Sequence, residues 1–230
     1  MDLLVDGFRR AVVLVLGGDP EIWAVLWLSL QVTGSATLLA LVLGIPAGVG
    51  LALTRFPGRT LVVSAVNTGM GLPPVVVGLF VTLLLWRSGP LGGWEILYTP
   101  AAIVIAQAVI AAPIVTGITL AAVQNVPARF RLQLLALGAS RAQMIWVVLR
   151  EARLPMLAAV MAGFGGIISE IGASMMVGGN IKGHTRTLTT AMVLETGKGN
   201  FDVAIALSIL LLTLVFWANW ALTALQQRRA

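Results

Sequence analysis

Five long apolar stretches divide this sequence, and each is long enough to cross a lipid bilayer as an α-helix. The stretches run over Ile22–Leu53, Leu61–Trp86, Tyr98–Val123, Met156–Val177 and Val203–Leu225. A helix needs roughly 20 consecutive apolar residues to span the hydrocarbon core. The composition agrees, since 58% of the 230 residues are hydrophobic and 10% are charged, against about 25% charged residues in soluble domains. We therefore predict an all-α polytopic membrane protein with five transmembrane helices.

The loops between these stretches carry unequal numbers of basic residues. One side of the predicted bundle receives Arg55, Arg59, Arg129, Arg131, Arg141, Arg150, Arg153, Arg228 and Arg229. The other side receives Arg9, Arg10, Arg87, Lys182, Arg186 and Lys198. Cytoplasmic loops of membrane proteins carry the excess of Lys and Arg, so the first side is predicted to be cytoplasmic. The N-terminus is then outside and the C-terminus inside.

The regions beside the five stretches complete the predicted domain organisation. Residues 1–21 are expected to form an interfacial helix, because the apolar part after Arg9 and Arg10 is too short for a secretion signal. Residues 22–225 form the transmembrane domain, and residues 226–230 form a cytoplasmic tail. The cytoplasmic loop of residues 124–153 has a helical composition, so we expect it to fold on the membrane surface.

This cytoplasmic loop contains the signals of two short helices joined by a glycine turn. Pro127 suits the first turn of a helix, and Gly138 suits the left-handed position just after a helix end. Ser140 and Gln143 have the spacing of a capping box that opens a second helix. The apolar side chains expected to face a partner protein are Phe130, Leu134, Leu135 and Leu137. The alternative is an amphipathic loop that lies on lipid headgroups.

The second apolar stretch is interrupted by helix-breaking residues at membrane depth. Gly69, Gly71, Pro73 and Pro74 free backbone carbonyls that must face protein or a water-filled path. The predicted bend therefore lines a transport pathway, or it is a kink that only improves packing.

Glu170, which follows Ser169, is the only acid inside an apolar stretch. A carboxylate in the membrane must be paired, hydrated or protonated, so we expect it to face the bundle interior. A proton relay needs further titratable groups at this depth, and the sequence offers none. We favour a structural role, in which Glu170 bonds hydroxyls or backbone of a neighbouring helix, over direct contact with a substrate.

The loop after the fourth stretch is rich in glycine and cations. The cations are Lys182, His184, Arg186 and Lys198. Together with exposed glycine N–H groups, they would attract a dianion. In the alternative, Thr185, Arg186 and Thr187 cap the helix that follows, and Arg186 pairs with Glu195.

The residue inventory excludes several classes of site. The chain has no cysteine and a single histidine, so we expect no metal site and no cofactor on this chain. Its bases are scattered and form no aromatic-interleaved patch, so nucleic acid is not an expected partner. A phosphate-binding Gly-x-x-x-x-Gly-Lys-Ser/Thr motif is missing from the sequence, so ATP hydrolysis is assigned to another protein.

Three segments of the sequence resemble the permease subunits of ABC importers. Residues 126–141, with Val-Pro and then Leu-Gly-Ala-Ser-Arg, are similar to the permease loop that sits in a cleft of the ATPase. Residues 132–134 replace the Glu-Ala-Ala of that family, and Arg150-Glu151 replaces its Leu-Pro. The Leu-Pro-Pro-Val-Val-Val-Gly run of residues 72–78 resembles molybdate-type permeases. Residues 178–200, with Gly-Gly-Asn-Ile and Leu-Glu-Thr-Gly-Lys-Gly, resemble the tungstate branch of the molybdate and tungstate importers.

This resemblance implies a MetI-like permease fold in the cytoplasmic (inner) membrane of a prokaryote, surrounded by lipid. It also implies a homodimer around the pathway, a cytoplasmic ATPase dimer that carries ATP and Mg, and an extracytoplasmic substrate-binding protein. Coupling to the ATPase falls on Phe130, Leu134, Leu135, Leu137, Gly138, Ala139, Ser140 and Arg141. The pathway or its gate falls on Gly69, Gly71, Pro73, Pro74, Ser169, Glu170, Asn180, Thr185, Arg186 and Thr187.

We therefore interpret the chain as the permease subunit of an ATP-driven oxyanion importer, with tungstate as the preferred cargo. Molybdate or another oxyanion is the alternative cargo. Two alternatives come from other classes of protein: a membrane enzyme that uses Glu170 and His184, and a secondary carrier that works without ATP. In the preferred interpretation this subunit is not itself an enzyme.

Overall fold

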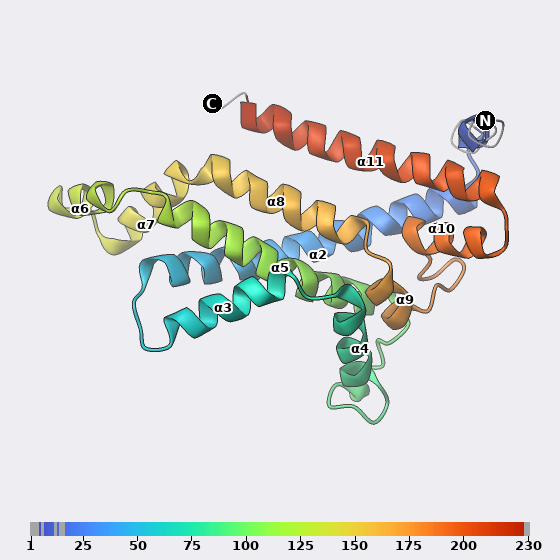
Figure 1. Ribbon diagram of the computed structural model, residues 1–230, viewed down its shortest axis with the longest axis horizontal. Coiled ribbons are helices and arrows are strands. Elements are labelled where there is room, and N and C mark those ends of the chain that lie inside the picture. The colour runs from blue at the N-terminus through green and yellow to red at the C-terminus, as the bar shows by residue number, and fades with distance from the viewer. Residues whose placement is uncertain (1–4, 6, 12, 14–16, 228–230) are drawn as a thin grey trace.

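The structure is a computed structural model that describes residues 5, 7–11, 13 and 17–227, and all regular elements in these ranges are helices (Figure 1). The long helices are α2 (Pro20–Leu53), α5 (Pro100–Gln124) and α11 (Phe201–Gln227). The shorter ones are α3 (Arg59–Met70), α4 (Pro74–Leu85), η1 (Gly92–Trp94), α6 (Ala128–Ala136), α7 (Arg141–Glu151), α8 (Arg153–Ile168), α9 (Gly172–Gly178) and α10 (Leu188–Gly197). The predicted all-α class is confirmed.

The two ends of the chain are only partly described. Residues 5, 7–11 and 13 are helical, and α2 begins at Pro20, inside the segment of residues 1–21 that was predicted to be an interfacial helix. The other residues before Gly17, and residues 228–230 of the predicted tail, lie outside the described ranges.

Three helices are long and apolar enough to cross a membrane alone, namely α2, α5 and α11. Two further candidates are bent pairs: α3 and α4 meet at 104°, and α8 and α9 meet at 61°. The stretches Leu61–Trp86 and Met156–Val177, each predicted as one span, are therefore both divided into two helices. Among residues 17–227 the number of spans is three, or five if each bent pair counts as one.

Helix α5 is the centre of the bundle, because α2, α3, α4, α8 and α9 all pack against it. Glycines of α2 allow the closest approach. A Cβ atom at Gly44 would lie 2.8 Å from a methyl group of Val115, and one at Gly48 would lie 2.7 Å from the Thr116 carbonyl oxygen. Small residues serve this purpose in membranes, where close packing replaces the hydrophobic effect as the force between helices.

Helix α4 projects from the body of the bundle and packs on α9 (Figure 1). A Cβ atom at Gly78 would lie 2.6 Å from Ala173 Cα, and one at Gly172 would lie 2.6 Å from Val75 Cγ2. Phe80, on the far side of α4, is 62% exposed. The second halves of the two bent pairs therefore contact each other.

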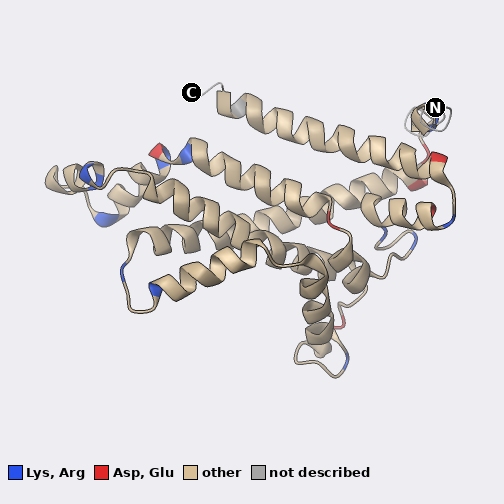
Figure 2. Cartoon of the chain, in the orientation of Figure 1, with Lys and Arg blue, Asp and Glu red and all other residues tan. Residues whose placement is uncertain are grey.

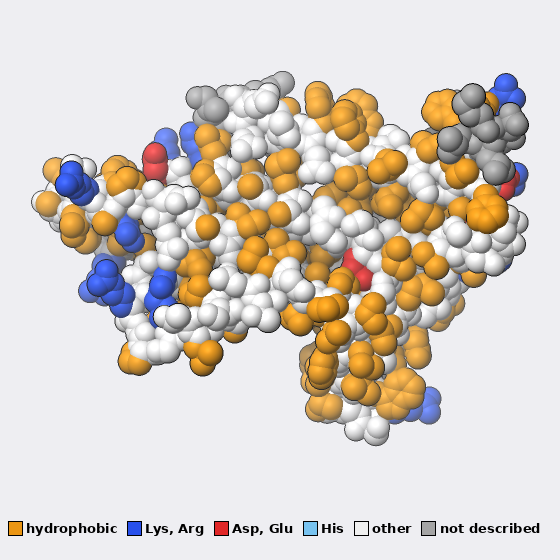
Figure 3. Space-filling view, in the orientation of Figure 1, with side chains coloured by type: hydrophobic (Ala, Val, Ile, Leu, Met, Phe, Trp, Pro, Cys, Tyr) orange, Lys and Arg blue, Asp and Glu red, His pale blue; other side chains and the backbone are white. Residues whose placement is uncertain are grey.

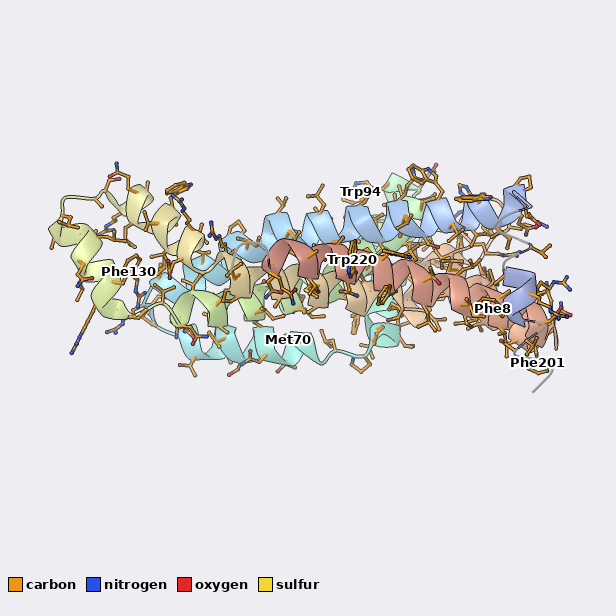
Figure 4. The ribbon with its side chains drawn as sticks, turned by 90° about the horizontal axis from the view of Figure 1, so that it is seen from above. Phe8, Met70, Trp94, Phe130, Phe201 and Trp220 are labelled. Atoms are coloured by element: carbon orange, nitrogen blue, oxygen red, sulfur yellow. The ribbon has the colours of Figure 1, made fainter. Side chains whose placement is uncertain are left out.

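Charged residues gather mostly at the two ends of the bundle, as Figure 2 shows, and apolar side chains cover much of the surface between them (Figure 3). One end carries α6 and α7, and the other carries α10 and the N-terminus. Trp220 of α11, which Figure 4 labels, is 56% exposed on the surface between these ends. Apolar side chains at such positions suit contact with lipid.

Candidate functional site

The turn between α6 and α7 has the geometry that the sequence predicted. Gly138 has φ +85°, and its N–H donates to the Leu135 carbonyl at 3.0 Å. The N–H of Ala139 donates to the Leu134 carbonyl at 3.1 Å, which completes a Schellman motif. Ser140 and Gln143 form the predicted capping box. The turn is thus fixed by local hydrogen bonds, and a side chain at residue 138 would be strained.

The apolar surface of α6 differs from the predicted one. Phe130 is partly buried and packs against the core around Val123 and Val148, so the prediction that it is exposed was wrong (Figure 4). Leu134 shares this inward face because it is four residues further along. The exposed leucines are Leu132, Leu135 and Leu137, at 65%, 43% and 85% exposure. Arg141 is also exposed, at the start of α7.

Proline and glycine separate α3 from α4, as the sequence indicated. Helix α3 ends at Met70, Gly71 follows it, and α4 begins at Pro74. The Pro73 carbonyl accepts the N–H of Val76 at 2.9 Å. A Cβ atom at Gly69 would lie 2.8 Å from the ring of Pro113 on α5, so close packing explains this glycine. No regular backbone bond crosses the break, because Pro73 and Pro74 have no N–H to donate.

Glu170 lies at the break between α8 and α9 and is 6% exposed. Its carboxylate accepts the N–H groups of Ala173 at 2.9 Å and Ser174 at 3.1 Å, and the Ser174 hydroxyl at 3.2 Å. Its carbonyl accepts the Thr189 hydroxyl at 3.1 Å. Ser169 donates its hydroxyl to the Gly165 carbonyl. These bonds are of the kind expected from a structural role for Glu170, directed at the first turn of α9.

Sequence reasoning missed Gln107, a buried amide on the central helix α5. The side chain is 3% exposed, and its Nε2 donates to the Ser174 hydroxyl at 3.3 Å. The available signal was a lone amide in the apolar run from Ala101 to Ala112. Gln107 connects α5 to the same serine that Glu170 binds.

The loop between α9 and α10 is held by its own polar side chains. Asn180 has φ +50°, and its Oδ1 accepts the Arg186 Nε at 3.3 Å. The buried Thr185 hydroxyl accepts the Ile181 N–H at 2.9 Å. Thr187 forms a capping box with Thr190 at the start of α10, as the alternative interpretation of this loop expected. Thr185 and Arg186 bond within the loop and do not cap the helix.

The ion pairs at this end of the bundle differ from the predicted pair of Arg186 with Glu195. Arg186 lies 3.6 Å from Glu21 of α2, and Lys182 lies 2.7 Å from the same carboxylate. Glu195 instead pairs with Lys198 at 2.7 Å. Hydrogen bonds from Asn200 and Lys198 hold the pKa of Glu195 below its ordinary value of 4.5. Three of the four predicted anion-attracting cations are therefore paired with acids, and two of these three share the carboxylate of Glu21.

These ion pairs border a cavity of about 400 Å³ between α2, α10 and α11. Arg10 enters it from the N-terminal segment and pairs with Asp202 of α11 at 2.7 Å. In residues 17–227 and the described residues before them, no group of three or more His, Asp or Glu side chains could hold a metal ion. The cavity is thus bordered by opposite charges and lacks the ligand set of a metal site.

The proteins with sequences similar to this chain include three permease proteins of transport systems. A probable anion ABC transporter permease protein of Haloferax volcanii is 43% identical over 83% of this chain and 84% of that protein. The tungstate uptake system permease protein TupB of Peptoclostridium acidaminophilum is 37% identical over 99% of this chain and 100% of that protein. The molybdenum transport system permease protein ModB of Escherichia coli is 29% identical over 86% of this chain and 93% of that protein.

The fold also matches a solved transporter. An inward-facing MetNI methionine ABC transporter aligns with a TM-score of 0.76 at 23% identity, over 93% of this chain and 99% of that chain. This likeness confirms the predicted permease fold. Residues 40–230 match the sequence family described as the binding-protein-dependent transport system inner membrane component. With most of its length inside that match, the chain belongs to the family of binding-protein-dependent transport system inner membrane components.

Proposed function

We propose that this chain is the permease subunit of an ABC importer that carries tungstate across the inner membrane of a prokaryote. The observation that carries the proposal is the likeness to a tungstate uptake permease over nearly the whole of both chains. The fold, similar to that of a methionine ABC transporter, supports it. Molybdate is the alternative cargo, favoured by the likeness to a molybdenum transport permease.

Family membership makes the chain a transport component and not an enzyme. The geometry agrees, because both oxygens of the buried Glu170 carboxylate accept hydrogen bonds from the first turn of α9, which is a structural arrangement. The alternative of a membrane enzyme is therefore not retained.

The proposal includes three partners. Two copies of the chain enclose the pathway, a cytoplasmic ATPase dimer that carries ATP and Mg binds α6, and an extracytoplasmic protein delivers the anion at the α10 end. Support for the ATPase contact comes from Leu132, Leu135 and Leu137, which are exposed on a helix beyond the ends of α2 and α5. The Gly138 turn, with Ala139, Ser140 and Arg141, sets the direction of that helix.

The proposed orientation places the N-terminus outside and the C-terminus in the cytoplasm. Its support is the excess of arginine at the end that carries α6 and α7 (Figure 2). The proposed domain limits follow: an interfacial segment at residues 1–21, the transmembrane domain at 22–225 and the tail at 226–230.

We place the pathway beside the two breaks in the bent helix pairs. The support is that both breaks open onto the contact between α4 and α9, where backbone groups are free of regular helix bonds. Gly71, Pro73 and Pro74 form one break, and Ser169 and Glu170 form the other. Gly69 holds the first break against α5. The loop residues Asn180, Thr185, Arg186 and Thr187 form the gate at the α10 end.

Uptake into proteoliposomes tests this function. The chain is reconstituted with its ATPase and its binding protein, and tungstate accumulation is measured with and without ATP. ATP-dependent accumulation that excess molybdate reduces only weakly is expected. Preferential uptake of molybdate would assign the alternative cargo, and accumulation driven by an ion gradient without ATP would indicate a secondary carrier.

A further inference from the structure

Gln107 has a polar atom that the fold leaves without a partner. The side chain lies on α5 and is 3% exposed. Its Nε2 donates to Ser174, whereas its Oε1 has no hydrogen-bond partner within the described part of the chain. Turning the amide over would only leave the nitrogen unpaired in place of the oxygen. A buried polar group without a partner destabilises a fold, and in a lipid bilayer no bulk water relieves it.

Two other buried side chains share this property, the hydroxyls of Thr82 and Thr119. A threonine in a helix can turn its hydroxyl to the carbonyl one turn earlier. Thr116 does so with the Ala112 carbonyl at 2.7 Å. A glutamine amide has no such local solution for both of its ends. Of the three residues, only Gln107 has an unpaired atom, Oε1, that no bond within its own helix can satisfy.

Gln107 begins a chain of hydrogen bonds that reaches the break between α8 and α9. Its Nε2 donates to the Ser174 hydroxyl, and that hydroxyl donates to the Glu170 carboxylate. Helix α9 in turn supports α4 through the contact of Gly78 with Ala173. The hydrogen bond from the Gln107 amide to the Ser174 hydroxyl thus adds a polar link to the direct packing of α5 on α9.

We propose that Gln107 is a positioning residue for transport, which holds α9 in two alternative positions through Ser174. In the present position the Ser174 hydroxyl donates to Glu170. When α9 shifts on α5 with Glu170 still bound to the N–H groups of Ala173 and Ser174, the same hydroxyl rotates and donates to the unpaired Oε1 of Gln107. The serine O–H then has a partner in both positions. This inference rests on the proposed function as a permease.

Replacing Gln107 should lower the transport rate without lowering the stability of the fold. Leucine at residue 107 has a similar size and removes the unpaired acceptor, and the Ser174 hydroxyl still donates to Glu170, so no buried donor loses its partner. Gln107→Leu should therefore unfold at the same temperature as the wild type or higher. Its maximal uptake rate should fall about 5-fold, the change in rate that corresponds to one hydrogen bond. The binding-protein concentration for half-maximal uptake should not change, because residue 107 is buried.

The experiment uses the complete complex in proteoliposomes, with Thr119→Val as the matched control. That variant also removes an unpaired buried oxygen from α5 and should keep the wild-type uptake rate. Ser174→Ala should lower the rate as Gln107→Leu does, and the double variant should be no slower than either single one. Rates that multiply in the double variant would overturn the proposal.

Two other results would overturn it. If Gln107→Leu transports at the wild-type rate, the amide has no role in the cycle. If its unfolding temperature falls in parallel with uptake, the amide is only a structural contact. ATP hydrolysis stimulated by the loaded binding protein is measured in the same vesicles and should fall with uptake. If the wild type does not transport tungstate, the stimulation of ATP hydrolysis can still be compared between the wild type and Gln107→Leu. The proposal for Gln107 can therefore be tested independently of the proposed cargo.

Discussion

Replacing Glu170 by leucine should remove most of the folded protein. The carboxylate accepts the N–H groups of Ala173 and Ser174, and leucine accepts neither. A buried donor left without a partner costs about 1–3 kcal/mol, so these two N–H groups predict a loss of about 2–6 kcal/mol. This loss is a large part of the about 5–15 kcal/mol that stabilises a typical protein. The Ser174 hydroxyl adds little, because it can turn to Gln107.

Glutamine at residue 170 keeps one acceptor oxygen, so one N–H keeps its partner and the expected loss is about 1–3 kcal/mol. The assay is thermal unfolding of the purified complex, followed by tungstate uptake with the same preparation. Glu151→Leu, at an exposed acid of α7, is the control and should unfold like the wild type. An unchanged unfolding temperature for Glu170→Leu would refute the structural role. Loss of uptake in a fully folded Glu170→Gln variant would assign a role to the charge itself.

Three further predictions concern the two ends of the molecule. Gly138→Val should prevent co-purification with the ATPase while the bundle still inserts, because valine is strongly disfavoured at φ +85°; normal ATPase stimulation by the binding protein would contradict this. Reporter fusions after Ala230 and in the loop of residues 87–97 should report opposite sides of the membrane, and a shared side would remove the five-span topology. Glu195→Gln should lower the unfolding temperature at pH 7, and the unfolding temperature of this variant should fall less steeply than that of the wild type below pH 4.5. The reason is that the lowered pKa of Glu195 stabilises the fold at pH values above the ordinary 4.5. This stabilisation is lost as the pH falls through the pKa of the folded state. Glu95→Gln is the control for the pH measurements. If Glu195→Gln has the same dependence of unfolding temperature on pH as the wild type, the prediction is wrong.

Features that depend on a few neighbouring residues could be predicted from the sequence. The Gly138 turn, the Ser140 capping box and the cap at Thr187 all have their donors and acceptors within a few positions. Their geometry is set by backbone bonds that any tertiary context must still satisfy. The apolar stretches could also be identified from the sequence, because the thickness of the bilayer fixes the length of a spanning helix.

Features set by tertiary packing could not be predicted in this way. The four-residue spacing of Phe130 and Leu134 showed that they share a face of α6, but only the packing of α6 on Val123 and Val148 shows that this face points inward. The prolines predicted a break after α3 but not the angle of 104° between α3 and α4. That angle depends on how α4 packs on α9. Arg186 had an acid nearby in the sequence at Glu195 and pairs instead with Glu21, on a helix far away in the chain.

The ion pair between Arg10 and Asp202 sets an order of events during synthesis. The two residues are separated by 192 positions, and both lie where the N-terminal segment meets the start of α11. Chains are made from the N-terminus at about 5–20 residues per second, so Arg10 waits roughly 10–40 s before Asp202 exists. During that interval Arg10 lacks the acid with which it pairs in the complete fold. This contact between the N-terminal segment and α11 therefore forms only after most of the chain has been made.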